Sequence, residues 1–557
     1  MCGINGFNWK DESLIKRMNG VIKHRGPDDE GVFMDERLSL GHVRLSILDL
    51  SPRGKQPMSN ADQTIRITYN GEIYNFQEIR EDLKKRGCVF KTDTDTEVIL
   101  AAYQQEGPSA FVKFNGIFAF CLYDTRDQCL CLVRDRLGIK PLYYYFDGQK
   151  FIFSSEIKAL QATARVSISL DETAVAEYLF SQNIYTEGFL KGIETLRPGT
   201  YLRFDLLKKK MTQHPYSLLE EEIHQERYLN NKRKSEDELV DELDQLLHRV
   251  VKDQLISDAP LGTICSGGLD SSLITAIASE YKKDLKIFNV RVADHACDES
   301  MYARKVAEFL HLDLIEEVLD QPTYLKTYQK CMAFEDLPLM HPNSVGIFLV
   351  SRKAREAGLS VLLSGEGADE LFGGYHHYKA FKKRLLLRRL PLVPRLLEKR
   401  HPLFLNEELM GVDSPDEKIL SQKPWLKKRL TITQNFYQKY CFVEKDDDRQ
   451  LKSFIAKDLQ YYLPAILRRT DRMSMAVGLE MRVPYLDNRL IAFALNLPVQ
   501  YQVSSSQVKI LLKKVAQRYL PDDIVYRAKK GFPLPIEQWL GVQNFKNKFL
   551  EDWKKGF

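Results

Sequence analysis

The stretch APLGTICSGGLDSSLITAIASEY, residues 259–281, decides the fold of the second half of the chain. The opening APLGTIC is an apolar run with the length of a buried strand, and SSLITAIASEY has the pattern of a helix. Gly267 and Gly268 permit a tight turn between them and let an anion approach the backbone. The helix N-terminus adds its dipole. The sequence therefore predicts a phosphate-binding loop with hydroxyl donors from Ser266, Ser271 and Ser272.

This loop differs from a Walker A loop because no Gly-Lys-Ser/Thr follows its glycines. Asp270 lies inside the loop, where a carboxylate would repel phosphate unless a cation lay between them. Mg²⁺ takes oxygen ligands from carboxylates and phosphates together. We therefore expect Asp270 to bind Mg²⁺. An ordinary turn without a ligand is the alternative.

A second loop, SGEGADELFGGY at residues 364–375, follows the apolar run LSVLL. Strands and helices alternate between residues 236 and 375, which is typical of βαβ units and a parallel sheet. If the two strands are neighbours, both loops meet beyond their carboxyl ends, where open α/β sheets bind ligands. We expect Asp369 to share Mg²⁺ with Asp270, and Glu366 to face the reacting centre.

These loops, together with DESMYARKVA (298–307) and RTDRMSMAVGLEMRVPYLD (469–487), resemble the asparagine synthetase family. The resemblance implies an ATP-pyrophosphatase domain that uses ATP and Mg²⁺ to activate a carboxylate as an acyl-adenylate. It implies that Glu366 is needed for a β-aspartyl-AMP intermediate. A lysine of RAKKGF would contact pyrophosphate, Lys529 by its position, with Lys530 as the alternative. The ATP contacts implied are Ile264, Ser266, Gly267, Gly268, Asp270, Ser271, Ser272, Val290, Ser364 and Gly365.

The first half of the chain is rich in strand signals. Short runs such as IRITYNGEIYN and GIFAFCLYD are separated by turn residues, and helical patterns at 15–22 and 97–106 interrupt them. This predicts an α+β domain with a large antiparallel sheet. Residues 211–235 are polar and weakly periodic, which predicts a linker between a domain at 2–210 and another at 236–557. Ser235 and Glu238 have the spacing of a capping box at the start of the next helix.

Cys2 indicates the chemistry of the first domain. If Met1 is removed, the α-amino group of Cys2 lies beside its own thiol and can act as its base. A cysteine at this position, followed by glycine, resembles the class II glutamine amidotransferase domain, which is an N-terminal nucleophile fold. We therefore expect a sandwich of antiparallel sheets flanked by helices. An α/β ATP-pyrophosphatase domain with a parallel sheet and a helical C-terminal part would follow it.

The same resemblance assigns roles to RLSILD, NGEIYN and TDTDTEVIL. Arg44 would pair with the α-carboxylate of glutamine. Asp95 would accept the α-ammonium group, with Asp93 as the alternative. Asn70 and the Gly71 N–H would form an oxyanion hole. The further glutamine contacts implied are Leu45, Ser46 and Glu72.

Together the two domains predict an ATP-dependent carbon–nitrogen ligase. It would release ammonia from glutamine at Cys2, activate aspartate as an adenylate, and join the two to give asparagine, AMP, pyrophosphate and glutamate. Amidation of another carboxylate, such as a sugar uronate in surface-polysaccharide synthesis, is the alternative. A non-catalytic scaffold would be expected to lack Cys2, Asp270 or Glu366, and all three are present.

Composition sets the remaining expectations. The chain has 557 residues, which is too many for one core. Its net charge of +5 gives no reason to expect nucleic acid, and no apolar run reaches the length of a membrane span. Nine cysteines without a CxxC pair predict reduced thiols and a cytoplasmic location. The expected partners are small molecules (glutamine, ATP, and aspartate or another carboxylate), and a homodimer is an open alternative.

Overall fold

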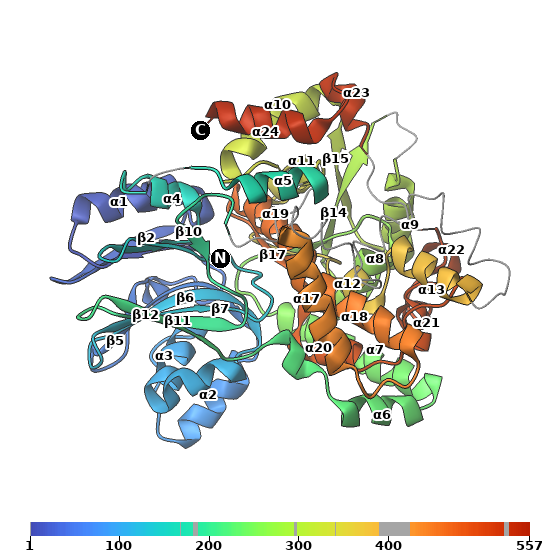
Figure 1. Cartoon of the computed structure of the whole chain (residues 1–557), viewed down its shortest axis with the longest axis horizontal. Helices are drawn as coiled ribbons and strands as arrows, with labels where there is room; N and C mark the ends of the chain where they lie inside the picture. The colour runs from blue at the N-terminus through green and yellow to red at the C-terminus, as the bar shows by residue number, and fades with distance from the viewer. Residues whose placement is uncertain are drawn as a thin grey trace.

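The computed structural model describes residues 2–166, 169–181, 188–293, 298–339, 341–388, 424–528 and 534–556. Two halves lie side by side, a blue-to-green half built on antiparallel sheets and a green-to-red half built on a parallel sheet (Figure 1). Within the described ranges, no helix is long and apolar enough to cross a membrane. The predicted fold class is confirmed for both halves.

The first half is a sandwich of two six-stranded sheets in which every pairing is antiparallel. Alternating apolar residues such as Ile4, Leu40 and Leu132 fill the space between the sheets. The first sheet has the order β10 (Ile193–Thr195), β8 (Tyr143–Phe146), β9 (Phe151–Ser154), β1 (Gly3–Phe7), β3 (Ser39–Arg44) and β2 (Asp29–Met34). The second has the order β12 (Lys210–Pro215), β11 (Thr200–Asp205), β7 (Cys129–Arg134), β6 (Gly116–Asp124), β5 (Ile65–Ile73) and β4 (Met58–Ser59).

Helices cover the outer faces of this sandwich. The predicted helices at 15–22 and 97–106 correspond to α1 (Glu12–Val21) and α3 (Asp95–Glu106). The sequence prediction missed α2 (Phe76–Lys85), which lies beside α3 below the second sheet (Figure 1). The other helices of this half are the short α4 (Ile157–Gln161) and α5 (Glu172–Ser181), which packs against α17 and α24.

Part of the predicted linker forms regular secondary structure. Strand β12 completes the second sheet, and α6 (Gln225–Arg233) follows it. All six residues of β12 are exposed, so this edge strand lacks the apolar alternation by which strands are found in a sequence. The predicted capping box is present: Ser235 accepts from the backbone of Glu238, and Glu238 accepts from that of Ser235.

The second half contains a five-stranded parallel sheet between helices. Its order is β15 (Leu314–Leu319), β14 (Lys286–Val292), β13 (Leu261–Ile264), β16 (Val361–Leu363) and β17 (Glu480–Arg482). The strands before the two predicted loops, β13 and β16, are neighbours with Leu261 opposite Val361, so both loops leave the same edge. The helices around the sheet begin with α7 (Glu236–Gln254), α8 (Leu269–Tyr281), α9 (Ser300–Leu310), α10 (Gln321–Phe334), α11 (Ser344–Glu356), α12 (Ala368–Phe372) and α13 (His376–Arg388).

Helices dominate the remaining residues that the structure describes, as predicted. After residue 423 they are α17 (Pro424–Lys439), α18 (Asp446–Tyr461), α19 (Leu463–Met475), α20 (Asn488–Leu495), α21 (Ile510–Ala516), α22 (Asp522–Val525), α23 (Ile536–Leu540) and α24 (Phe545–Gly556). Helix α19 lies between the two halves and packs on α11 and β17 (Figure 1).

Candidate active sites

Cys2 lies directly before β1, a strand in the interior of the first sheet, and its side chain is buried. Its backbone N donates to Oδ1 of Asn70 at 3.0 Å, and its Sγ lies 3.9 Å from the carbonyl oxygen of Leu45. A Cβ at Gly3 would lie 2.6 Å from Ile22 Cδ1 and 2.8 Å from Val43 Cγ2, so a larger residue there would crowd both side chains. The small residue after Cys2 thus allows the strand to hold the thiol in place.

Asn70 and Gly71 lie on β5, the strand that faces the start of β1. Because the backbone N–H of Cys2 can only donate, Oδ1 of Asn70 must face it, which leaves Nδ2 as a donor. This Nδ2 is buried and has no hydrogen-bond partner among the described residues. A Cβ at Gly71 would lie 2.1 Å from the carbonyl oxygen of Ile117, so only glycine fits there. An unused buried donor beside a thiol is what an oxyanion hole requires.

A small cavity around Cys2 is lined by most of the predicted glutamine contacts: Arg44, Leu45, Gly71, Glu72 and Asp95. The guanidinium of Arg44 donates to the backbone carbonyls of Leu48, Asp49 and Ser51, which fixes it at the cavity wall. A Cβ at Gly54 would lie 2.0 Å from Nη2 of Arg44, so the glycine makes room for it. Ser46 and Asn70 are not among the lining residues. The backbone N of Ser46 donates to Asp28, and Asn70 is fully buried beside Cys2.

The two aspartates proposed for the α-ammonium group lie in different surroundings. Asp95 is buried at the N-terminus of α3, where its Oδ2 accepts from the Tyr69 hydroxyl at 2.6 Å and from the Ile73 N–H at 2.9 Å. Asp93 is 77% exposed and pairs with Arg80. Only Asp95 lines the cavity.

Burial controls the protonation of this site. It raises the pKa of the Cys2 thiol, and it raises the pKa of Asp95 to about 6. Burial and the nearby carboxylates of Asp95 and Glu480 raise the pKa of Glu72 as well. A thiol with a raised pKa is protonated at neutral pH, so an adjacent base is needed to make the nucleophile.

The second cavity, about 250 Å³, lies where the loops after β13 and β16 meet. A Cβ at Gly267, whose φ is +71°, would lie 2.5 Å from the backbone N of Ala303, and one at Gly365 would lie 2.5 Å from that of Ser271. Glycine is therefore required for the loops to pack this closely. The predicted ATP contacts that line the cavity are Ile264, Ser266, Gly268, Asp270, Ser271, Ser364 and Gly365, together with Glu366 and Asp369.

Three predicted ATP contacts do not line this cavity: Gly267, Ser272 and Val290. Gly267 lies in the loop against the backbone of Tyr302 and Ala303. Val290 lies on β14 and packs against the apolar core on the sheet, and Ser272 is buried with its hydroxyl 3.5 Å from the Cys265 sulfur. Lys529 and its alternative Lys530 lie outside the described residues. The described cation nearest in sequence, Arg527, donates to the Gly267 carbonyl at 3.0 Å and pairs with Glu299.

Asp270 and Asp369 converge on one cation. Lys509, which is buried directly before α21, places its Nζ 2.5 Å from Asp270 Oδ2 and 2.6 Å from Asp369 Oδ1. Burial alone would lower the pKa of Lys509, but the two carboxylates raise it above its ordinary value. Nothing in the sequence distinguished Lys509 from other lysines; its role emerges only when α21 packs beside the loops.

This arrangement fits the predicted Mg²⁺ site. One carboxylate oxygen from Asp270 and one from Asp369 already lie against a single positive charge, that of Lys509. Mg²⁺ is usually bound by one or two carboxylates in this way. No third acidic, histidine or cysteine side chain joins them to complete a metal cluster within the described ranges. Phosphate oxygens and water would therefore supply the remaining ligands.

Glu366 is held by two residues of the RTDRMSM motif. Nη2 of Arg469 donates to its Oε1 at 2.6 Å, and Oγ1 of Thr470 lies 2.9 and 2.7 Å from its two oxygens. These contacts fix the carboxylate at the cavity wall. The motif contributes to the site by orienting Glu366 from α19.

The next residue of α19 reaches the first half of the chain. Arg25 donates from Nε to the carbonyl of Cys2 at 3.1 Å and from Nη2 to Asp471 at 2.9 Å. Both side chains are fully buried. One turn of α19 therefore contacts Glu366 on one side and, through Arg25, the backbone of Cys2 on the other.

Comparisons with known proteins identify a family for each half of the chain. The profile of a family described as a glutamine amidotransferase domain matches residues 1–217, and that of asparagine synthase matches residues 242–555. Glutamine-hydrolysing asparagine synthetase 1 of Bacillus subtilis (strain 168) is 33% identical, over 99% of this chain and 89% of its own. Asparagine synthetase 3 of the same strain is 31% identical, over 96% and 87%. The solved glutamine phosphoribosylpyrophosphate amidotransferase from B. subtilis is 14% identical, over 65% and 81%, at a TM-score of 0.31, too low to carry an argument.

Proposed function

Since this chain belongs to the family of glutamine-hydrolysing asparagine synthetases, we propose that it makes asparagine from aspartate, glutamine and ATP. Glutamine is hydrolysed at Cys2, aspartate is activated as β-aspartyl-AMP, and ammonia displaces AMP. The observation that carries the proposal is the pairing of two cavities in one chain. One surrounds Cys2, and the other contains Asp270, Glu366 and Asp369.

The first half-reaction begins with proton transfer at Cys2. After removal of Met1, the α-amine takes the proton of the thiol, and the thiolate attacks the amide carbon of glutamine. Nδ2 of Asn70 and the N–H of Gly71 donate to the oxyanion that forms. When this intermediate collapses, the α-ammonium returns the proton and ammonia leaves. Water then hydrolyses the thioester to glutamate.

Glutamine is oriented by charges at the ends of the cavity. The fixed guanidinium of Arg44 receives the α-carboxylate, and ionised Asp95 receives the α-ammonium group. Hydrogen bonds from Tyr69 and Ile73 lower the pKa of Asp95 against the effect of burial, which keeps the carboxylate ionised at neutral pH. Specificity for a free amino acid follows from this pair of opposite charges.

In the second half-reaction, the loops hold ATP and the helix α19 holds Glu366. The backbone and hydroxyls of residues 266–271 receive the phosphates at the N-terminus of α8. When bound to Asp270 and Asp369, Mg²⁺ would offset the charge of the leaving pyrophosphate. Glu366, fixed by Arg469 and Thr470, faces the centre where aspartate is adenylated and then attacked by ammonia.

Lys509 supplies the positive charge between the two aspartates when no metal is bound. Its ammonium balances Asp270 and Asp369, the two residues that would hold Mg²⁺, so lysine and metal would compete for the same carboxylates. With the metal bound, the Lys509 ammonium would be available to the phosphates as a flexible point charge. Lys529 keeps its predicted role beside pyrophosphate as a proposal.

The alternative acceptor, another carboxylate such as a uronate, gains no support from the relatives above, which are named asparagine synthetases. The test is to supply glutamine, ATP, Mg²⁺ and a panel of carboxylates and to measure AMP, pyrophosphate and amide. Aspartate should be the acid that yields AMP. If another acid yielded AMP and aspartate yielded none, that acid would be assigned as the acceptor instead of aspartate.

We propose a cytoplasmic location for two reasons. The reaction consumes ATP, and the eight cysteines among the described residues are free thiols. The homodimer stays a prediction.

A further inference from the structure

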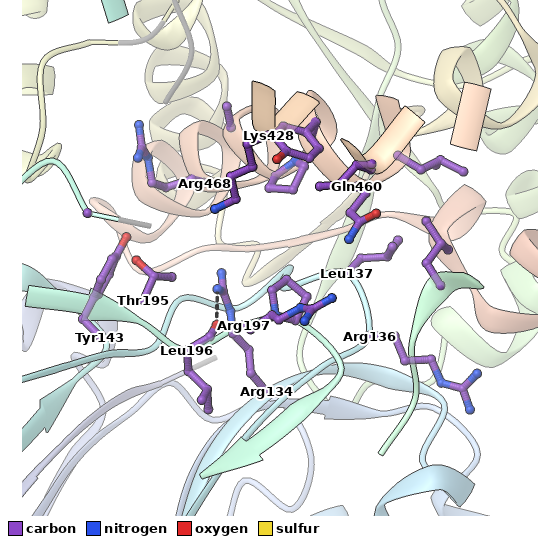
Figure 2. Close-up of a pocket in the computed structure, with 18 of the residues that line it drawn as sticks. Arg134, Arg136, Leu137, Tyr143, Thr195, Leu196, Arg197, Lys428, Gln460 and Arg468 are labelled. Atoms are coloured by element: carbon purple, nitrogen blue, oxygen red, sulfur yellow. Dashed lines mark hydrogen bonds between the residues drawn. The ribbon is translucent and has the colours of Figure 1, made fainter. Parts of the chain in front are cut away.

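The two halves of the chain leave part of the space between them unfilled. A cavity of about 460 Å³ lies between Arg134, Tyr143 and residues 188–198 of the first half and the helices α17, α18 and α19 of the second (Figure 2). Among the described residues, none lines both this cavity and the cavity around Cys2. The wall of the cavity around Cys2, by contrast, is in direct contact with the second half.

This contact is made by the turn at residues 255–260, which joins α7 to β13. The backbone N of Asp258 in this turn donates to the carbonyl oxygen of Ile47 at 2.9 Å. Oδ2 of the same residue accepts from the backbone N–H of Asp49 at 2.8 Å. One residue of the second half therefore holds both ends of the segment 47–49.

The segment 47–49 positions the guanidinium of Arg44. Two of the three backbone carbonyls that accept from Arg44 belong to it, that of Leu48 at 3.4 Å and that of Asp49 at 2.5 Å. Asp49 has a φ of +50°, a left-handed conformation that residues with a Cβ adopt only where surrounding contacts hold it. The hydrogen bond to Asp258 is one of these contacts. A shift of the segment would therefore move the carbonyl groups that fix Arg44.

The turn itself is fixed by the second half. Nη1 of Arg482, a buried side chain on β17, donates to the carbonyl oxygens of Gln254 at 2.6 Å and Ile256 at 2.7 Å. At the other end of the turn, the backbone N of Ser360 donates to the carbonyl oxygen of Pro260 at 2.9 Å, directly before β16. The turn therefore has a fixed place relative to β13, β16 and β17.

We propose that Asp258 is a positioning residue for glutamine, because it fixes the segment 47–49 and thereby the guanidinium of Arg44. The proposal rests on the role proposed above for Arg44, which receives the α-carboxylate of glutamine. Asp258 does not itself line the cavity, so it acts on the affinity for glutamine and not on the attack by Cys2. The second half thus completes the glutamine site of the first half.

Steady-state kinetics of Asp258→Ala test this role. The variant loses the acceptor for the Asp49 N–H, so KM for glutamine should rise at least about fivefold. The value of kcat should stay within about twofold, because Arg44 holds the substrate equally in the ground state and in the transition state. Asp258→Asn keeps an oxygen acceptor and should keep the KM of the wild type. Synthesis from ammonium, which bypasses glutamine, should be unchanged in both variants.

Alkylation of Cys2 separates the positioning of the substrate from a change in the thiol. The diazoketone analogue of glutamine carries both α-groups, and below saturation it should inactivate Asp258→Ala at least about fivefold more slowly than the wild type. Iodoacetamide carries neither α-group, so it should alkylate both proteins at the same rate. Asp284→Ala is the matched control and should behave as the wild type, since Asp284 is an exposed aspartate in the turn before β14 of the same sheet.

An unchanged KM in Asp258→Ala would overturn the proposal, and so would an equal defect in Asp258→Asn. Loss of ammonium-dependent synthesis would also overturn it, because it would show damage to the second half. Equal slowing of both alkylating reagents would place the defect at the thiol and refute positioning through Arg44. If the wild type itself does not hydrolyse glutamine, the proposed glutaminase function fails instead, and the same assay shows this before the variants are compared.

Discussion

Lys509 Nζ lies 2.5 Å from Asp270 Oδ2, and this buried ion pair occupies the position where the sequence predicted Mg²⁺. The second carboxylate, Asp369, lies 2.6 Å from the same nitrogen. Two acidic side chains from different loops could not lie together without a cation between them. The lysine thus keeps the phosphate-binding loops assembled in the absence of metal, and the two cations are expected to compete.

Replacing Lys509 with glutamine should make the site dependent on metal. Removal of one partner of a buried ion pair costs about 3–5 kcal/mol of the free energy of unfolding. Mn²⁺ should restore much of this loss in the variant and change the wild type little. Thermal unfolding with EDTA or Mn²⁺, without ATP, measures the effect. Lys513→Gln, on the next turn of α21, is the control. Equal response of all three proteins to Mn²⁺ would refute competition.

Replacing Cys2 with alanine should separate the two half-reactions. Glutamine-dependent synthesis should fall by at least about 10³-fold, because the nucleophile is lost. Synthesis from added ammonium chloride should continue, because the second cavity is intact. Amino-acid analysis of the products with each nitrogen source measures both. Loss of ammonium-dependent synthesis in a folded variant would contradict the two-site account.

Replacing Thr470 with valine tests whether α19 positions Glu366. The variant removes a hydrogen bond to a charged group, worth about 1.5–3 kcal/mol, so synthesis should slow by about 10- to 100-fold. Hydrolysis of glutamine should be unchanged. Serine at this position keeps the hydroxyl and should restore most of the rate. If Thr470→Val and Thr470→Ser are equally slow, the hydrogen bond is not the cause.

The pKa of Asp95, raised to about 6 by burial, predicts a pH dependence of glutamine binding. The α-ammonium group needs the ionised carboxylate, so KM for glutamine should rise as pH falls through about 6. The sign for stability is opposite to that of an aspartate whose pKa is lowered by folding. A folded-state pKa above the unfolded value stabilises the fold at low pH, and this contribution is lost as pH rises through about 6. Asp95→Asn should remove the pH dependence of KM and raise KM at pH 8.

Much of the fold and of both sites could be predicted because the relevant signals are local. Cys2 at the start of a strand, and the glycines around Asp270, can be read from short stretches. Lys509 could not be predicted, since its role depends on the packing of α21 against loops far away in the sequence. Strand β12 was missed because an exposed edge strand has no apolar alternation. Val290 and Ser272 were placed near ATP by resemblance, and their contacts depend on side-chain directions that resemblance does not supply.

The two sites together imply that one chain transfers the amide nitrogen of glutamine to aspartate. The most direct measurement supplies glutamine labelled with ¹⁵N at the amide, together with aspartate, ATP, Mg²⁺ and unlabelled ammonium. Mass spectrometry then reads the asparagine formed. The asparagine should be enriched in ¹⁵N above the surrounding ammonium, with AMP and pyrophosphate formed in equal amounts. Glutamate and labelled ammonium without asparagine, or AMP without any amide, would contradict this transfer.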